Sequence, residues 1–191
     1  MSEIKPIETF YKGYRFRSRL EARWAVFFDA LGIKYQYEPQ GFRMVYGMRY
    51  LPDFALYNVH WRGEHASAYT GKPGSPLYVE IKGADKYSDI RIDDRVRMEA
   101  FSKRFPLIVL GNIPRNDSEV ISPISMLPSF ELLDGDSYPG FFTLYNEEVW
   151  FCGPDHDEHR PGSTDRALAY ARQARFEYGE TPYIEAEDIP F

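Results

Sequence analysis

Apolar residues recur with a helical period in the first strong element of the chain. The pattern predicts a helix over Arg19–Leu31, whose single apolar stripe consists of Leu20, Trp24, Phe27, Phe28 and Leu31. Ser18 just before this helix and Glu21 three positions later form a capping-box pattern. Gly32 then fits a left-handed stop, so both ends of the helix are predicted.

Four later segments have the composition of strands. Lys34–Glu38 is short and rich in tyrosine, Arg49–Tyr57 contains a mostly apolar run, and Leu77–Gly83 is a β-branched run that ends in glycine. Leu107–Leu110 is a continuous apolar run, which is typical of a buried strand. Asn58–Pro76 contains Gly, Ser and Pro and is predicted to be a surface loop.

A second, more polar helix is predicted over Ile92–Phe105, with Val96, Ala100 and Phe101 facing inward. The order of helix, strands, helix and strand indicates an α/β fold with a central mixed β-sheet flanked by helices. We assign this core to residues 1–112.

Beyond residue 112 the pattern changes. Phe141–Tyr145 and Val149–Phe151 are predicted to form a hairpin, and a last helix is predicted over Asp165–Tyr178. We interpret residues 113–191 as a C-terminal extension, either separate from the core or packed on the same domain.

The composition is that of an ordinary globular chain, since 43% of the 191 residues are hydrophobic and 27% are charged. No apolar run approaches the roughly 20 residues that span a bilayer, and the first residues lack the pattern of a secretory signal. Cys152 is the only cysteine, which excludes a disulfide within the chain and suits a reducing compartment. We therefore expect a cytoplasmic protein without membrane association.

Charge is unevenly distributed along the chain. Residues 1–112 contain 18 Lys and Arg against 13 Asp and Glu, a net charge of +5, whereas residues 113–191 contain 5 against 16, a net charge of −11. Such asymmetry points to partners: an anionic one for the basic half and a basic protein for the acidic extension. Two ordinary solvated faces are the alternative.

Three polar residues share one face of the predicted strands. Strand alternation directs Glu80 and Lys82 to one face and their aliphatic neighbours to the other, and Asp53 stands opposite its apolar neighbours in the same way. If the two strands are adjacent, two carboxylates and an ammonium group converge. Carboxylates hold Mg²⁺, the ion acidifies a bound water, and a lysine orients or deprotonates that water. The set therefore suits phosphodiester hydrolysis.

Pro52-Asp53 followed by Glu80-Ile81-Lys82 resembles the signature of the PD-(D/E)xK superfamily, the restriction-endonuclease-like nucleases. The helix that carries Glu21 is similar to helices that donate a third acid in several members. The resemblance covers about Tyr11 to Leu110 and implies a restriction-endonuclease-like core, dependence on Mg²⁺ or Mn²⁺, and cleavage of DNA. The metal ligands are then expected to be Asp53, Glu80, the carbonyl of Ile81 and Glu21, with Lys82 beside them.

Four arginines near Glu21 are expected to contact DNA phosphates: Arg15, Arg17, Arg19 and Arg23. For each of them the plainer interpretation is a solvated helix start. Glu21 has the alternative role of a capping acid, and Lys82 that of a lysine guarding a sheet edge.

A polar segment after the predicted hairpin contains residue types that bind zinc: Cys152, Asp155, His156, Asp157 and His159. Structural zinc sites usually show paired cysteines or a Cys₂His₂ spacing, and this chain has one cysteine. We interpret the segment as a polar loop.

The leading hypothesis is a Mg²⁺-dependent DNA endonuclease whose catalytic residues are Asp53, Glu80, Lys82 and Glu21. The alternative is a non-catalytic or weakly active nuclease-fold subunit of a nucleoprotein or defence complex, in which the acidic half docks a basic partner or mimics DNA. A homodimer would allow both DNA strands to be cut, but no heptad or exposed apolar stripe indicates one. The sequence leaves the form of the nucleic-acid substrate open.

Overall fold

The computed structural model describes residues 6–62, 70–71, 76–84, 87–115, 123–127, 141–145, 148–152 and 164–177. Its helices are α1 (Arg19–Ala30), α2 (Ile92–Ser102) and α3 (Asp165–Gln173), with short 3₁₀ turns η1 (Val45–Gly47) and η2 (Tyr87–Asp89). The strands are β1 (Thr9–Tyr11), β2 (Tyr14–Phe16), β3 (Tyr35–Tyr37), β4 (Phe42–Arg43), β5 (Arg49–Tyr50), β6 (Phe54–Leu56), β7 (Val59–Arg62), β8 (Thr70–Gly71), β9 (Leu77–Ile81), β10 (Leu107–Leu110), β11 (Pro123–Leu127), β12 (Phe141–Tyr145) and β13 (Glu148–Cys152).

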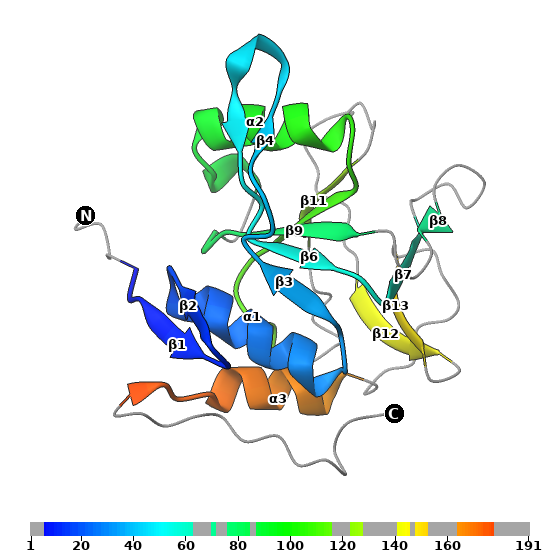
Figure 1. The fold of residues 1–191 in the computed structure, drawn as a ribbon. Helices are drawn as coiled ribbons and strands as arrows, with labels where there is room; N and C mark the ends of the chain where they lie inside the picture. Colours follow the sequence, from blue (N-terminus) through cyan, green and yellow to red (C-terminus); the bar gives the residue numbers. More distant parts are fainter. Residues whose placement is uncertain are drawn as a thin grey trace.

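A five-stranded sheet in the order β11-β10-β9-β6-β3 forms the centre of the molecule. β9 and β10 run parallel, and the remaining neighbours run antiparallel. Figure 1 shows α1 and α3 on one side of this sheet and α2 on the other. The prediction of an α/β fold with a mixed sheet and flanking helices is confirmed at this level.

The central strands send alternate side chains into two buried clusters. Val79 and Ile108 lie in the cluster that contains the apolar face of α1, whereas Tyr78 and Val109 lie in the cluster beneath α2. This period of two is the geometry of a pleated strand. The next position of β9, Glu80, therefore points to the α2 side of the sheet.

Helix α1 begins and ends close to its predicted bounds. The Ser18 hydroxyl accepts a hydrogen bond from the Glu21 N–H at 3.1 Å and caps the helix. Gly32 follows the helix with φ of +66°, a left-handed conformation that glycine adopts without steric cost. Trp24 and Phe27, from the predicted apolar stripe, are fully buried.

The predicted strand Arg49–Tyr57 is wrong as a single element. β5 pairs with β4 in a separate two-stranded hairpin, and β6 begins only at Phe54. Pro52 has no N–H to donate to a ladder, and Asp53 lies in a bend just before β6. The two halves of the segment therefore belong to different sheets.

The second predicted helix is longer than the helix in the structure. α2 ends at Ser102 rather than at Phe105, and Val96, expected to face inward, is 47% exposed. Phe101 is buried as predicted, and Met98, three residues before it, is buried in the same cluster.

The predicted loop Asn58–Pro76 contains two strands, β7 and β8, which corrects that prediction. They belong to a four-stranded sheet in the order β12-β13-β7-β8, in which β7 runs parallel to β13. The β12–β13 hairpin itself is confirmed. Because β7 finds its partner some ninety residues away, no local pattern reveals it.

The described residues beyond position 112 pack against the first half of the chain. Phe142, Phe151 and Leu168 lie in the same buried cluster as α1. α3 runs beside α1 in Figure 1 (orange and blue). Within the described part of the chain, no helix has both the length and the apolar character needed to cross a membrane.

Candidate active site

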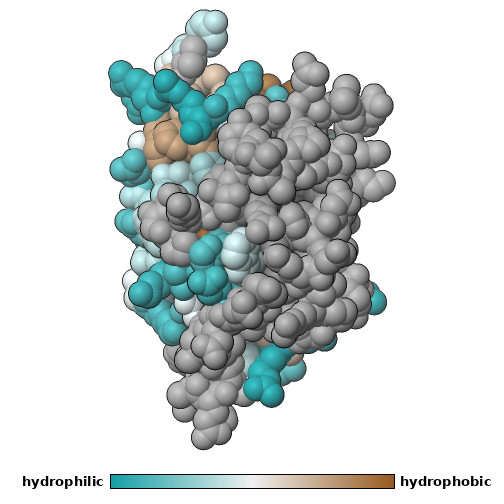
Figure 2. Space-filling view, turned by 90° about the vertical axis from the view of Figure 1, so that its right-hand side faces the viewer, coloured by the Kyte–Doolittle hydropathy of each residue, from teal (hydrophilic) through white to brown (hydrophobic). Residues whose placement is uncertain are grey.

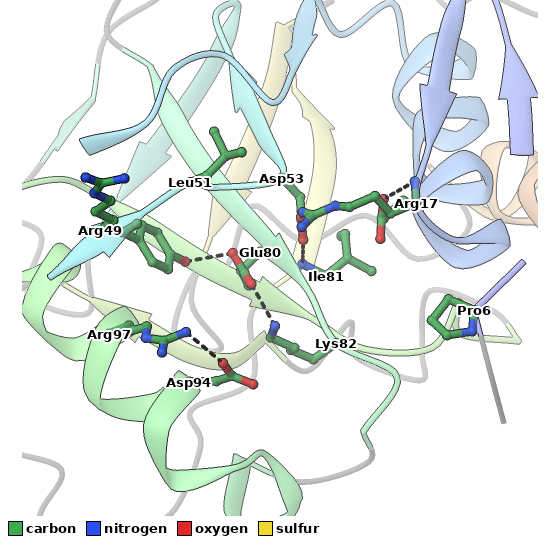
Figure 3. A pocket seen from close by; sticks show the side chains of 12 residues that line it. Pro6, Arg17, Arg49, Leu51, Asp53, Glu80, Ile81, Lys82, Asp94 and Arg97 are labelled. Carbon is green, nitrogen blue, oxygen red and sulfur yellow. Dashed lines mark hydrogen bonds and ion pairs between the residues drawn. The ribbon is translucent and has the colours of Figure 1, made fainter. Parts of the chain in front are cut away.

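A cavity of about 400 Å³ lies where β6 and β9 approach the start of α1 (Figure 3). Side chains of α2 and of the β4–β5 hairpin complete its wall. The residues that the sequence predicted as catalytic or metal-binding all line it: Glu21, Asp53, Glu80, Ile81 and Lys82. Their convergence depends on the pairing of the central strands.

β6 and β9 are antiparallel neighbours, which is the condition that the sequence analysis set for convergence. Phe54 of β6 pairs with Val79 of β9. Asp53 just before Phe54 and Glu80 just after Val79 therefore lie next to this pair on the same side. The Ile81 N–H donates a hydrogen bond to the Asp53 carboxylate at 2.7 Å. The two acids are therefore held side by side by the backbone of the sheet.

Glu80 joins two further groups of the cavity. Its carboxylate accepts a hydrogen bond from the Tyr50 hydroxyl at 2.8 Å and lies 2.8 Å from the Lys82 ammonium nitrogen. Glu80 is only 7% exposed. Burial raises the pKa of Tyr50, and the Glu80 charge raises it further, so the Tyr50 phenol stays protonated and acts as a donor.

Glu21 is both a helix cap and part of the cavity wall. Its carboxylate accepts hydrogen bonds from the Ser18 hydroxyl at 2.8 Å, the Tyr37 hydroxyl at 2.6 Å and the Arg17 backbone N–H at 3.1 Å. The carboxylate therefore stabilises the start of α1, although its backbone partner is the Arg17 N–H and not the Ser18 N–H of a capping box. Its role as a metal ligand stays a prediction. A negative charge at the first turn of α1 is also favoured by the helix dipole.

Arg17 is the cation closest to Asp53. Its guanidinium pairs with the Asp53 carboxylate at 2.5 Å and with Glu38 at 2.9 Å. Burial lowers the pKa of Arg17, but the charges of Asp53 and Glu38 raise it above its ordinary value. Arg17 is therefore a permanent cation inside the cavity.

Asp53 is the most deeply buried of the three acids. It is 2% exposed, and burial raises the pKa of its carboxyl well above the usual range; the charges of Glu80 and Glu21 raise it further. The Ile81 N–H and the Arg17 guanidinium act in the opposite direction. A cation bound beside Asp53 would favour the charged form of its carboxyl.

Lys82 lies directly after β9, and its backbone N–H donates to the Leu110 carbonyl at 2.9 Å. Burial lowers the pKa of the Lys82 ammonium, but the neighbouring Glu80 and Asp53 raise it, and the net shift is upward. In this arrangement Lys82 is a charged donor rather than a proton acceptor.

The chemistry of the donor set fits a hard divalent cation. Carboxylate oxygens of Glu21, Asp53 and Glu80 face one cavity, and oxygen ligands are those that Mg²⁺ and Mn²⁺ prefer. In the described residues, however, no three His, Cys, Asp or Glu side chains are gathered closely enough to form a ready metal site. In this structure Arg17 forms an ion pair with the Asp53 carboxylate and Lys82 forms one with the Glu80 carboxylate.

The other predicted DNA contacts lie elsewhere. Within the described part of the chain, Arg17 alone among the four arginines lines the cavity. Arg15 pairs with Glu8 and Arg19 pairs with Glu177, while Arg23 is partly buried. With Arg17, which pairs with Asp53 and Glu38, three of the four predicted phosphate-binding arginines are paired with acids of the same chain.

Sequence reasoning assigned no role in the site to four polar wall residues, three of which are charged. Asp94 and Arg97 come from the first turns of α2, where Asp94 lies 3.8 Å from Arg97. Tyr50 and Arg49 come from β5. The predicted helix start could have suggested Asp94, but nothing local indicates that β5 turns back toward the cavity.

The zinc interpretation of the polar segment after the hairpin falls largely outside the described residues. Asp155, His156, Asp157 and His159 lie outside the described residues, and Cys152 is described only as the last residue of β13.

Comparison of the chain with protein-family models, with curated proteins and with solved structures finds no match.

Proposed function

We propose that the protein is a divalent-cation-dependent DNA endonuclease that hydrolyses phosphodiester bonds in this cavity. The observation that carries the proposal is the meeting of Asp53, Glu80 and Lys82 from adjacent strands at one concave site. An ordinary folded domain has no need to bury two neighbouring carboxylates, because their repulsion and desolvation destabilise it.

Asp53 and Glu80 are the proposed ligands of a Mg²⁺ or Mn²⁺ ion, with the Ile81 carbonyl and Glu21 as further oxygen donors. A bound cation would supply an acidified water and would neutralise charge at the phosphate. Lys82 remains an ammonium group, so its role is to orient the attacking water and to donate to the phosphate oxygens.

Arg17 has a second role in this proposal. It neutralises Asp53 in the cation-free protein. Its planar guanidinium also has the geometry that binds a phosphate through two parallel hydrogen bonds. With Asp53 engaged by a bound cation, the Arg17 guanidinium would be free to bind the scissile phosphate and to counteract its negative charge.

Cleavage of DNA in the presence of Mg²⁺ or Mn²⁺ tests the proposal. Supercoiled plasmid and end-labelled linear DNA are incubated with the protein, with and without EDTA. We expect Asp53→Asn and Lys82→Met to lose at least about 100-fold in cleavage rate, since each removes a group that acts on the reacting atoms. Asp93→Asn and Lys103→Met are matched controls, because both residues are exposed and neither lines the cavity. Cleavage that survives in the two cavity variants places the activity elsewhere.

The second candidate function is a nuclease-fold binding subunit without catalysis. The pairing of Asp53 with Arg17 and of Glu80 with Lys82 favours it, because both carboxylates are already neutralised. The net charge of −11 in residues 113–191 fits a basic partner or mimicry of DNA. Calorimetric titration with Mn²⁺ separates the two functions, since a binding subunit gives no heat and no rise in melting temperature.

A further inference from the structure

The β4–β5 hairpin ends in an aromatic residue that has no packing role. The tip residue Tyr46 is 96% exposed, and its backbone is left-handed with φ of +59°. Figure 1 shows the hairpin extending past α2, and Figure 2 shows the same end of the molecule standing clear of its surroundings. The Met44 N–H donates to the Met48 carbonyl at 2.7 Å and closes the turn.

Tyrosine is a costly choice at this position. A left-handed backbone suits Gly, Asn or Asp, and a bulky side chain there is strained. Since the ring is almost fully exposed, no burial offsets the strain. An asparagine in place of Tyr46, followed by the left-handed Gly47, would serve the structure of the hairpin better.

A second unfavourable feature lies just below the tip. Arg43 and Arg49 are direct cross-strand partners, and both are exposed. Like charges directly opposite each other destabilise a strand pair. Among the described residues, no acid forms an ion pair with either arginine, and Arg49 also lines the cavity. The hairpin therefore exposes two guanidinium groups, those of Arg43 and Arg49, that are available to bind an anionic partner.

The hairpin is anchored firmly at its foot. Tyr50 lies against Phe101 of α2 with ring centroids 4.6 Å apart, and Phe42 lies 5.0 Å from the same ring. Met44 is buried in the α2 cluster just two residues before the tip. The reach of four residues places Tyr46 within about 14 Å of Tyr50 in the cavity wall. The tip is thus joined by a short segment to Arg49 and Tyr50, which line the cavity.

We propose that this hairpin is a DNA-binding arm, in which Tyr46 stacks on an unpaired base. Arg43 and Arg49 bind phosphates of the strand that continues into the cavity. Aromatic rings combined with basic groups are how proteins hold single-stranded nucleic acid, because every base offers a π-face. The inference rests on the proposed function and specifies its substrate: DNA with unpaired bases next to the cleaved bond, as in single strands, frayed ends or branches.

Fluorescence anisotropy in EDTA tests the arm without cleavage. The probes are a labelled 20-nucleotide single strand and its duplex, measured with the full chain. We expect Tyr46→Asn to weaken single-strand binding roughly tenfold or more and duplex binding much less. Tyr46→Trp, which keeps a stacking ring, is expected to bind like the unaltered protein. Arg43→Gln is expected to lower the slope of log affinity against log salt by about 0.7 on the single strand.

The melting temperature of Tyr46→Asn separates binding from structure. We expect it to equal or exceed that of the unaltered protein, because Asn suits the left-handed turn. Four results overturn the proposed DNA-binding arm. They are a Tyr46→Asn variant that binds the single strand as tightly as the unaltered protein, a variant that loses as much affinity for the duplex as for the single strand, a variant whose melting temperature falls together with its affinity, and an unaltered protein that does not bind the single strand. If cleavage with Mg²⁺ persists while Tyr46→Asn binds normally, the nuclease proposal stands and the arm falls. If Tyr46→Asn loses binding in a protein that never cleaves, the arm stands and the nuclease proposal falls.

Discussion

Asp53 is the residue at which folding and the proposed chemistry conflict most directly. It is buried beside Glu80 and Glu21, and one cation, Arg17, contacts its carboxylate. Burial and the two neighbouring acids raise the pKa of Asp53, so the folded chain binds a proton at this position more tightly than the unfolded chain does. The resulting stability is fully present below the unfolded pKa and is lost as pH rises through the folded pKa.

Asp53→Asn is therefore expected to stabilise the fold while it abolishes activity. Asn keeps an acceptor for the Ile81 N–H and removes the repulsion with Glu80, and Arg17 retains Glu38. We expect the melting temperature to rise by roughly 2–4 °C at pH 7–8, which corresponds to about 1 kcal/mol in a chain of this size. The difference from the unaltered protein should shrink as pH falls, because the native carboxyl then becomes protonated as well.

Thermal melts between pH 4 and pH 8, with and without Mn²⁺, measure both effects. Mn²⁺ is expected to raise the melting temperature of the unaltered protein and to leave that of the Asn variant unchanged. A variant that melts lower than the unaltered protein at every pH would mean that the Arg17–Asp53 pair stabilises the fold more than the acid cluster destabilises it.

The sequence identifies the site residues that stand in regular patterns and misses those that do not. Glu80 and Lys82 are predictable because the aliphatic residues between and around them alternate cleanly. Arg17 is predicted as a phosphate contact but not as the partner of Asp53, since that pair spans 36 residues. Tyr50 could not be predicted as a site residue, because its hydrogen bond to Glu80 depends on how the β4–β5 hairpin packs against α2.

At the scale of elements, α1 contributes both to the buried core and to the wall of the candidate site. Its N-terminus presents Glu21 to the cavity, and its apolar face packs against the central sheet. The Ser18 hydroxyl binds both the backbone N–H and the carboxylate of Glu21. A single hydroxyl thus caps the helix and orients one wall of the cavity.

Ser18→Ala is expected to destabilise the protein by about 1 kcal/mol, the usual cost of losing an N-cap hydroxyl. Ser18→Thr retains the hydroxyl and serves as the matched control. Urea denaturation followed by circular dichroism gives the difference in free energy of unfolding. If the Ala variant is as stable as the Thr variant, the Tyr37 and Arg17 hydrogen bonds to Glu21 hold the helix start by themselves.

Elements with strong local signals are predicted, and those that depend on distant partners are not. α1, β9 and β10 follow from periodicity and length, and the β12–β13 hairpin from two apolar runs. The β1–β2 hairpin is missed because its turn uses Lys12 and Gly13, both at positive φ, instead of an Asn-Gly pair. β7 and β8 are missed because β7 gains its stability from β13, which no local window can reveal.

At the scale of the molecule, the described residues of both halves share one buried cluster. Leu168 of α3 is fully buried there together with the apolar face of α1. The uneven charge of the sequence therefore does not separate the described halves physically. The cavity depends on this shared packing, because α1 carries Glu21.

Leu168→Ala is expected to cost about 2–5 kcal/mol, since it leaves a void between α3 and α1. Gln173→Ala on the exposed side of α3 is the control. Tryptophan fluorescence and far-ultraviolet circular dichroism during urea denaturation should then give one shared transition at a lower midpoint. A loss below about 0.5 kcal/mol, or two separate transitions, would show that α3 contributes little to the core that holds α1.

The hydrogen bond from the Ile81 amide to the Asp53 carboxylate has a consequence for ion selectivity. It holds the Asp53 carboxylate against the backbone of β9, next to Glu80. In the proposed metal site one ligand is thus fixed by the sheet, so a bound ion would have to fit its position. Mg²⁺ and Mn²⁺ have short metal–oxygen distances, whereas Ca²⁺ needs longer bonds and more ligands. Ionic radius, more than charge, would then decide which cation the protein accepts.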